Sequence, residues 1–194
     1  GGTLQDVFNP STGEVSGQVR LSSSKELDAV VQIASEAAVA WGATPPAKRA
    51  QVMYRFKRLL EENADKIASS ISSEHGKTHD DALGEVARGM EAVEFSCGIP
   101  HLLKGTFSEQ VATSIDVYSI PQSLGVVAGI TPFNFPAMVP MWMFPNALAC
   151  GNAFILKPSE RDPSVTLILA DLLKEAGLPE GVFSVVQGDK VVVD

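Results

Sequence analysis

The chain has 194 residues, of which 45% are hydrophobic, and it carries a net charge of −8 from 23 acidic and 15 basic side chains. A nucleic-acid surface needs a basic patch to replace counterions, and an anionic membrane attracts basic segments, so neither is an expected partner. The hydrophobic content suits a large buried core of one domain.

The first residues are expected to form a loop with short extended pieces. Residues 1–22 contain the turn sequence Asn9-Pro10-Ser11-Thr12-Gly13, in which proline sets φ and glycine allows a positive value. A helix is predicted to begin after Ser23, because Ser23 and Glu26 match a capping box. Apolar residues spaced for one helical face follow as far as Trp41.

Two further helices complete a helical part over residues 23–104. One begins near Pro45-Pro46, where the missing N–H is harmless, and is predicted to end near Gly76. The next runs from about Asp80 to Leu103. Its predicted apolar face has the spacing of a helix and consists of Leu83, Val86, Met90, Val93 and Cys97.

The character of the sequence changes to strands after Gly105. Residues 107–121 read as hairpin-like strands, and residues 122–194 alternate three apolar runs with two helical segments. The runs are Gly125–Thr131, Ala153–Leu156 and Val182–Val186, and the helices are Ala137–Ala149 and Pro163–Ala176. Continuous apolar strands indicate burial on both faces, and the order βαβαβ predicts a parallel sheet with right-handed crossovers. The last residues resemble the first turn of another helix, so we expect the domain to continue.

Three loops lie at the predicted carboxyl ends of these strands, where open parallel sheets bind ligands. They are Thr131–Pro136, Lys157–Arg161 and Gln187–Asp189. Lys157 and Glu160 suit recognition of ribose hydroxyls, and Gly188 would let a flat ring or a phosphate approach the backbone. The sequence has no G-x-G-x-x-G, so a cofactor here would not use that phosphate turn. Ordinary strand–helix connections are the alternative.

Two side chains are candidates for chemistry, each with a simpler structural explanation. Asn134 lies between two prolines and could donate its amide N–H to an oxyanion, or it could cap the helix that follows. Arg88 could capture a substrate carboxylate, because nearby Gly84 and Gly89 allow another segment to come close. It could equally be a solvated arginine paired with a neighbouring glutamate.

No metal site or disulfide is expected. His75, His79 and His101 lack ligand-like spacing, and the two cysteines, Cys97 and Cys150, form no C-x-x-C pair. The thiols favour a reducing compartment. Because neither a signal peptide nor a membrane helix is recognisable, we expect a cytoplasmic protein, or one of the mitochondrial matrix in a eukaryote.

The sequence resembles the aldehyde dehydrogenase family over essentially its whole length. The resemblance rests on PQSLGVVAGITPFNFPAMVPMWMFPNALACGNAFILKPSERDPS, together with FNPSTGE and SSEHGKTHDDALGEVARGMEAVEFS. Most family members have tryptophan where Phe133 stands, and this residue, with its flanking motifs, is similar to the methylmalonate-semialdehyde branch. The implied fold is α/β: N-terminal helices followed by an incomplete Rossmann-like parallel sheet, the N-terminal part of the NAD-binding domain, without the catalytic domain.

The resemblance implies roles for individual residues. Asn134 matches the asparagine that helps to form the oxyanion hole, and Arg88 matches an arginine that recognises the substrate carboxylate in this branch. The residues implied to contact NAD are Thr131, Phe133, Lys157, Glu160 and Arg161, to which the strand-end argument adds Gly188.

The implied reaction is the NAD-dependent oxidative decarboxylation of malonate or methylmalonate semialdehyde, with coenzyme A as co-substrate, to acetyl-CoA or propanoyl-CoA. Neither Cys97 nor Cys150 matches the motif of the family's nucleophile, which lies downstream, so we expect the chain alone to be inactive. The strands near residues 111–121 resemble part of the oligomerisation element, which implies a homodimer or homotetramer. A hydrolytic dehydrogenase for another semialdehyde, or a non-catalytic nucleotide-binding module, remains an alternative.

Overall fold

The computed structural model describes residues 2–193, and in its first element the expected extended pieces pair as a hairpin. β1 (Leu4–Phe8) pairs antiparallel with β2 (Val15–Arg20) across the predicted turn. Val7, Val19 and Leu21 form a small buried cluster of their own. The turn and the short extended pieces were predicted, but their pairing was not, because the strands are short and mostly exposed and therefore show little hydrophobic alternation.

The helical part contains more breaks than the sequence predicted. α1 (Ser24–Ala43) begins with the expected capping box at Ser23. The predicted second helix is divided into α2 (Pro46–Glu62) and α3 (Ala64–His75), because the Asn63 side chain bonds to the Leu59 carbonyl and ends α2. The third is divided into α4 (His79–Cys97) and the short α5 (Ile99–Leu102) at Gly98.

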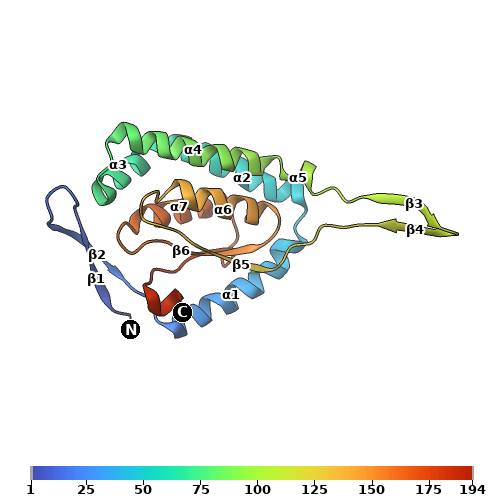
Figure 1. The fold of residues 1–194 in the computed structure, drawn as a ribbon, viewed down its shortest axis with the longest axis horizontal. Helices are drawn as coiled ribbons and strands as arrows, with labels where there is room; N and C mark the ends of the chain where they lie inside the picture. The colour runs from blue at the N-terminus through green and yellow to red at the C-terminus, as the bar shows by residue number, and fades with distance from the viewer. Residues whose placement is uncertain (1, 194) are drawn as a thin grey trace.

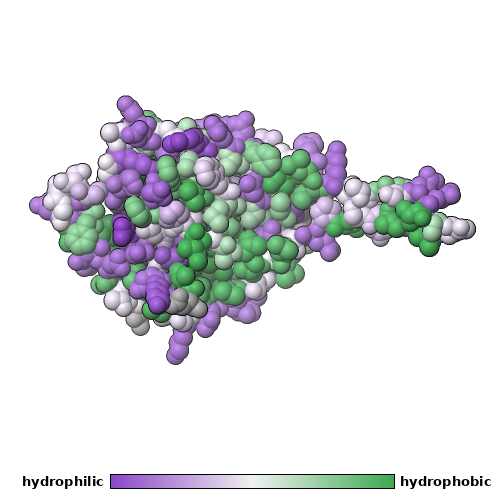
Figure 2. Space-filling view, viewed as in Figure 1, coloured by the Kyte–Doolittle hydropathy of each residue, from purple (hydrophilic) through white to green (hydrophobic). Residues whose placement is uncertain are grey.

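Two strands project from the body of the molecule. β3 (Phe107–Ala112) and β4 (Ile115–Tyr118) pair antiparallel, and every residue in them is exposed. Figure 1 shows the hairpin extending far beyond the helices, and Figure 2 shows apolar side chains along it. Within residues 2–193, no helix is long and apolar enough to cross a membrane.

The parallel sheet has the predicted topology. β5 (Val126–Ile130), β6 (Ala153–Lys157) and β7 (Phe183–Val185) lie in that order, with α6 (Met138–Ala149) and α7 (Ser164–Glu175) as the connections. The final turn, α8 (Lys190–Val193), follows. Burial on both faces is confirmed only for β6, since Ala128 and Ile130 of β5 are exposed and β7 is half-buried.

The elements form layers around the sheet, as Figure 1 shows. α1 covers one face, where Ala34 and Ala38 pack with Ala153 and Ile155. α6 and α7 cover the other face, and α2–α4 pack outside them with the main core between. A buried hydrogen bond joins α1 to α6, on opposite sides of the sheet: Trp41 Nε1 donates to the Leu148 carbonyl at 2.9 Å.

Candidate functional site

The loop after β5 presents Asn134 at the surface and buries Thr131. Thr131 is 5% exposed, and its hydroxyl oxygen has no hydrogen-bond partner among the described residues. Its backbone N–H donates to the Lys157 carbonyl at 3.0 Å, which ties the end of β5 to the end of β6. Asn134 is exposed, and no group in residues 2–193 is hydrogen-bonded to its side-chain amide. The amide is therefore available to a ligand.

The cap of α6 comes from Glu85 rather than from Asn134. Glu85 of α4 is completely buried, and its Oε1 accepts hydrogen bonds from the backbone N–H groups of Ala137 at 2.8 Å and Met138 at 3.1 Å. The residue before α6, Ala137, has no side-chain cap. The capping alternative for Asn134 is thereby removed, because a carboxylate from another helix satisfies these N–H groups.

Lys77, in the loop between α3 and α4, connects Glu85 to the Asn134 backbone. Its Nζ lies 2.5 Å from Glu85 Oε2 and donates to the Asn134 carbonyl oxygen at 2.8 Å. It also lies 4.0 Å from the centre of the Phe135 ring. Neither Lys77 nor Glu85 was predicted as a site residue. Glu85 is a charged residue on the buried face of α4, which consists of Ala82, Glu85, Val86, Gly89 and Val93. That face is rotated from the predicted one, since Leu83 and Met90 are only half-buried.

Arg88 lies on the exposed side of α4, close to the same loop. Its guanidinium carbon is 5.8 Å from the centre of the Phe135 ring, and its Nε donates to the Gly84 carbonyl. A side chain at Gly89 would meet Met141 of α6 at 2.2 Å, whereas one at Gly84 would meet nothing. Only Gly89 therefore allows close packing, and Arg88 has its guanidinium near the Phe135 ring without a carboxylate partner among the described residues.

The end of β6 carries the predicted pair of a lysine and a glutamate. Lys157 Nζ and Glu160 Oε2 are 3.1 Å apart, with the side chains 13% and 29% exposed. Burial opposes ionisation of Glu160, but a backbone hydrogen bond and the charge of Lys157 together hold its pKa below the usual value. The pair therefore presents a charged donor beside a charged acceptor at the edge of the sheet, an arrangement that can bind vicinal hydroxyls.

Phe133 and Arg161 bring the first two loops into contact. The Arg161 guanidinium carbon lies 4.8 Å from the centre of the Phe133 ring, and the His75 ring stacks on Phe133 at 6.3 Å. Burial lowers the pKa of His75, and the charge of Lys77 lowers it further. The structure thus brings five of the predicted cofactor residues, Thr131, Phe133, Lys157, Glu160 and Arg161, to the ends of two neighbouring strands.

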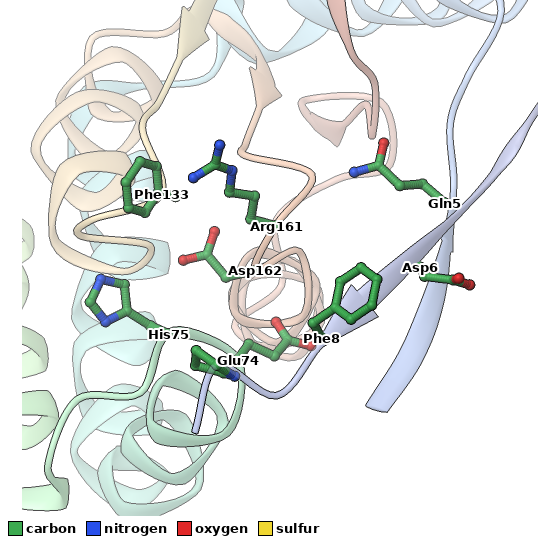
Figure 3. Close-up of a pocket in the computed structure, with 9 residues that line it drawn as sticks. Gln5, Asp6, Phe8, Glu74, His75, Phe133, Arg161 and Asp162 are labelled. Carbon is green, nitrogen blue, oxygen red and sulfur yellow. The ribbon is translucent and has the colours of Figure 1, made fainter. Parts of the chain in front are cut away.

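A pocket of about 480 Å³ lies beside these loops, and its lining contains more acidic than basic side chains. Figure 3 shows Phe133 and Arg161 side by side at one end of it, with Phe8 from the N-terminal hairpin opposite. It is lined by Gln5, Asp6, Phe8, Pro10, Glu74, His75, Phe133, Arg161 and Asp162. With three carboxyl groups against one arginine, this pocket does not suit a phosphate group.

Asp162 is the unusual group of this pocket. It is 2% exposed, and within the described residues neither carboxyl oxygen has a partner with hydrogen-bond geometry. Burial, and then the charge of Glu74, raise the pKa of Asp162 to about 7, although the nearby Ser159 hydroxyl acts in the opposite direction. Glu74 itself accepts hydrogen bonds from the backbone N–H and the hydroxyl of Ser164, at the start of α7.

The first two helices of the α/β unit therefore both begin against a protein carboxylate. Helix N-termini usually attract anions, and phosphate groups of nucleotides bind there in many parallel sheets. Glu85 occupies that position for α6 and Glu74 for α7. Neither helix start is therefore open to a phosphate group, in agreement with the absence of a G-x-G-x-x-G turn.

The glycine at position 188, after β7, has a structural explanation that needs no ligand. A side chain there would meet Val192 of α8 at 2.5 Å, so its absence is required for α8 to pack. A role of Gly188 toward a ligand stays a prediction.

Among residues 2–193, no group of three or more His, Cys, Asp or Glu side chains could hold a metal ion. Cys97 is buried and Cys150 is partly buried, and both are free.

Comparisons with known proteins agree on one family. The profile of the Aldehyde dehydrogenase family matches residues 1–194. A malonate-semialdehyde dehydrogenase of Pseudomonas aeruginosa is 60% identical over the whole chain, and the acylating methylmalonate-semialdehyde dehydrogenase of Arabidopsis thaliana mitochondria is 49% identical over 97% of it. The chain spans 39% of the first protein and 31% of the second.

Solved structures lead to the same family. A methylmalonate-semialdehyde dehydrogenase from Oceanimonas doudoroffii superposes with a TM-score of 0.97 at 58% identity, covering 99% of this chain and 39% of that one. A structure from Sinorhizobium meliloti, assigned to the same enzyme and solved with NAD, gives 0.98 at 56% identity, covering 100% and 39%. The sequence motifs, the parallel sheet and these matches together establish that the chain belongs to the aldehyde dehydrogenase family.

Proposed function

We propose that the chain forms part of an NAD-dependent dehydrogenase that converts malonate or methylmalonate semialdehyde and coenzyme A to acetyl-CoA or propanoyl-CoA. The proposal rests on the free Asn134 amide next to Phe135, on Arg88 near the Phe135 ring, and on the Lys157–Glu160 pair at the end of the neighbouring strand. The names of the most similar relatives support the same substrate class. Because the chain spans 31–40% of those relatives, the activity is proposed for the whole protein.

Asn134 supplies the donor for the oxyanion. Attack on an aldehyde carbonyl moves negative charge onto its oxygen, and a fixed N–H donor at 2.7–3.1 Å stabilises that charge. The Asn134 amide is exposed and free of protein partners in residues 2–193, while its backbone is held by Lys77. The backbone contact fixes the position from which the amide is presented to the oxyanion.

Arg88 holds the carboxylate of the substrate. Both proposed semialdehydes carry a carboxylate close to the aldehyde, and a guanidinium binds such a group through two parallel hydrogen bonds. Arg88 lies over the Phe135 ring, one residue along the chain from Asn134. A substrate held by its carboxylate at Arg88 can therefore direct its aldehyde oxygen toward Asn134.

Lys157 and Glu160 bind the ribose hydroxyls of the cofactor. NAD, when bound, supplies the acceptor for the hydride that leaves the substrate. The fit to this chain rests on the 3.1 Å pair at the end of β6 and on the unpartnered, buried hydroxyl of Thr131 on the neighbouring strand. Phe133 and Arg161, which contact each other between the loops after β5 and β6, line the cofactor site.

The nucleophilic thiolate comes from the rest of the protein. Burial raises the pKa of Cys97 and of Cys150, and Cys150 also ends α6, where the negative end of the helix dipole disfavours a thiolate. Neither group suits nucleophilic attack at neutral pH. We therefore expect this chain by itself to bind substrate and cofactor groups without forming the thioester.

The projecting hairpin serves assembly into a homodimer or homotetramer. Its exposed apolar side chains include Phe107, Val111, Ile115, Val117 and Tyr118. Both strands have unpaired edges in the described part of the chain, and such edges add strands from another subunit. The reducing environment that suits two free thiols is the cytoplasm, or the mitochondrial matrix in a eukaryote.

The test is turnover by the whole protein. Malonate semialdehyde should yield NADH and acetyl-CoA when NAD and coenzyme A are present, and the Asn134→Ala variant should lose 100-fold to 1000-fold in kcat, about the cost of one oxyanion donor. Formation of the free acid without coenzyme A would favour the hydrolytic alternative. NAD binding by a whole protein without turnover of any semialdehyde would favour the non-catalytic module.

A further inference from the structure

Lys77 contacts the backbone of the residue that carries the proposed oxyanion donor, Asn134. Lys77 is 16% exposed, and its Nζ makes two hydrogen bonds, to the completely buried Glu85 carboxylate and to the Asn134 carbonyl oxygen. An ammonium group has three donors and no acceptor, so most of its capacity is committed to these two partners. Lys77 thus joins the loop after α3, the middle of α4 and the loop after β5 at one nitrogen atom.

The same group of contacts holds four positions along the Asn134 loop. Lys77 bonds to the Asn134 carbonyl, and the Phe135 ring lies near both Lys77, at 4.0 Å, and Arg88, at 5.8 Å. The other oxygen of Glu85 accepts from the backbone N–H groups of Ala137 and Met138. The loop is therefore anchored from the residue that carries the free amide to the first turn of α6.

We propose that Lys77 is a positioning residue, which acts with Glu85 through the Asn134 carbonyl to hold the Asn134 amide in place for the oxyanion. This inference rests on the proposed function. A displacement of about 1 Å in a positioning group can cost about 100-fold in rate, so loss of the Lys77 contact should affect turnover far more than substrate binding.

The decisive variant is the double replacement K77M/E85Q in the full-length dehydrogenase. It removes both charges together, so no unpaired charge is left buried, and the amide introduced by E85Q keeps a carbonyl oxygen for the N–H groups of α6. We expect kcat to fall about 100-fold with KM changed less than threefold. The variant K77R should recover most of the rate, because it restores a donor to the Asn134 carbonyl.

Two controls separate positioning from general stability. K57M removes a lysine that pairs with Glu61 and Glu94 on the outer surface of α2 and α4, and it should leave kcat unchanged. Adding K77M/E85Q to Asn134→Ala should cost no further rate, since both changes disable the same donor. Independent, multiplying losses in the combined variant, or an unchanged kcat in K77M/E85Q, would overturn the proposal.

A measurement on the chain itself keeps the inference distinct from the proposed function. In protein labelled with ¹⁵N-asparagine, the Asn134 backbone and side-chain signals should shift or broaden in K77M/E85Q, return in K77R and stay unchanged in K57M. A wild-type enzyme that turns over no semialdehyde would defeat the proposed function alone. Asn134 signals that are unaffected by K77M/E85Q would defeat the positioning role, whatever the activity.

Discussion

The amino ends of α6 and α7 are both capped by a glutamate from the helical layer, but the two glutamates have different electrostatic surroundings. Glu85, which caps α6, is completely buried and paired with Lys77. Glu74, which caps α7, has no cation within salt-bridge distance among residues 2–193 and acts on Asp162 as a like charge. The same capping device thus fixes one loop and leaves an acidic, proton-sensitive pocket at the other.

The largest loss of stability should come from replacing Glu85, the glutamate that is paired with Lys77. Glu85→Ala leaves Lys77 without its buried partner and two N–H groups of α6 without an acceptor. Breaking a buried pair in this way costs about 3–5 kcal/mol. Urea unfolding should show the loss in the free energy of unfolding, and a change below 1 kcal/mol would mean that the pair contributes little.

The pH dependence of stability should come from Asp162, beside the like charge of Glu74. The pKa of Asp162 is about 7 in the folded protein against an ordinary value of 3.8, so the folded state holds its proton more strongly. Stability is therefore lost as pH rises from about 4 to about 7, by about 2–4 kcal/mol. Asp162→Asn should remove this slope and be more stable than the wild type at pH 8. Parallel stability–pH curves for the two proteins would contradict the assignment.

Replacing Glu74 should have a smaller net effect, because two consequences oppose each other. Glu74→Ala removes the acceptor at the start of α7, which costs about 1 kcal/mol, but it also removes the like charge beside Asp162. At pH 8 we expect a loss below about 1 kcal/mol, together with a lower pKa of Asp162. Carboxyl ¹³C shifts followed through a titration would measure the pKa, and an unchanged value would remove Glu74 as a cause.

The smallest effect on stability should accompany a clear effect on binding at the end of β6. Lys157→Met replaces a lysine whose pair with Glu160 is partly exposed, so the free energy of unfolding should change by less than about 1 kcal/mol. Loss of a charge-assisted hydrogen bond to a ribose hydroxyl should weaken NAD binding about 10-fold. Calorimetric titration of the whole protein would test this, and an unchanged affinity would exclude Lys157 from the cofactor site.

The sequence was sufficient for the features that depend on local pattern. The capping box at Ser23 predicted the start of α1, and the apolar runs bounded by glycine and proline, in the order βαβαβ, predicted the parallel sheet. The motifs around Asn134 and Lys157 also indicated the family, which the comparisons confirmed. These features are encoded within a few neighbouring residues, and short-range chemistry is enough to recognise them.

Other features depend on partners that are distant in the chain, and only the tertiary structure decided them. The rotated face of α4 was not predicted. Two local features, the pairing of β1 with β2 and the break at Asn63, were also not predicted. The caps from Glu85 and Glu74 join residues 52 and 90 positions apart, and Lys77 reaches Asn134 across 57. A buried carboxylate is tolerated only where donors from other elements surround it, and that condition exists only after the layers have packed.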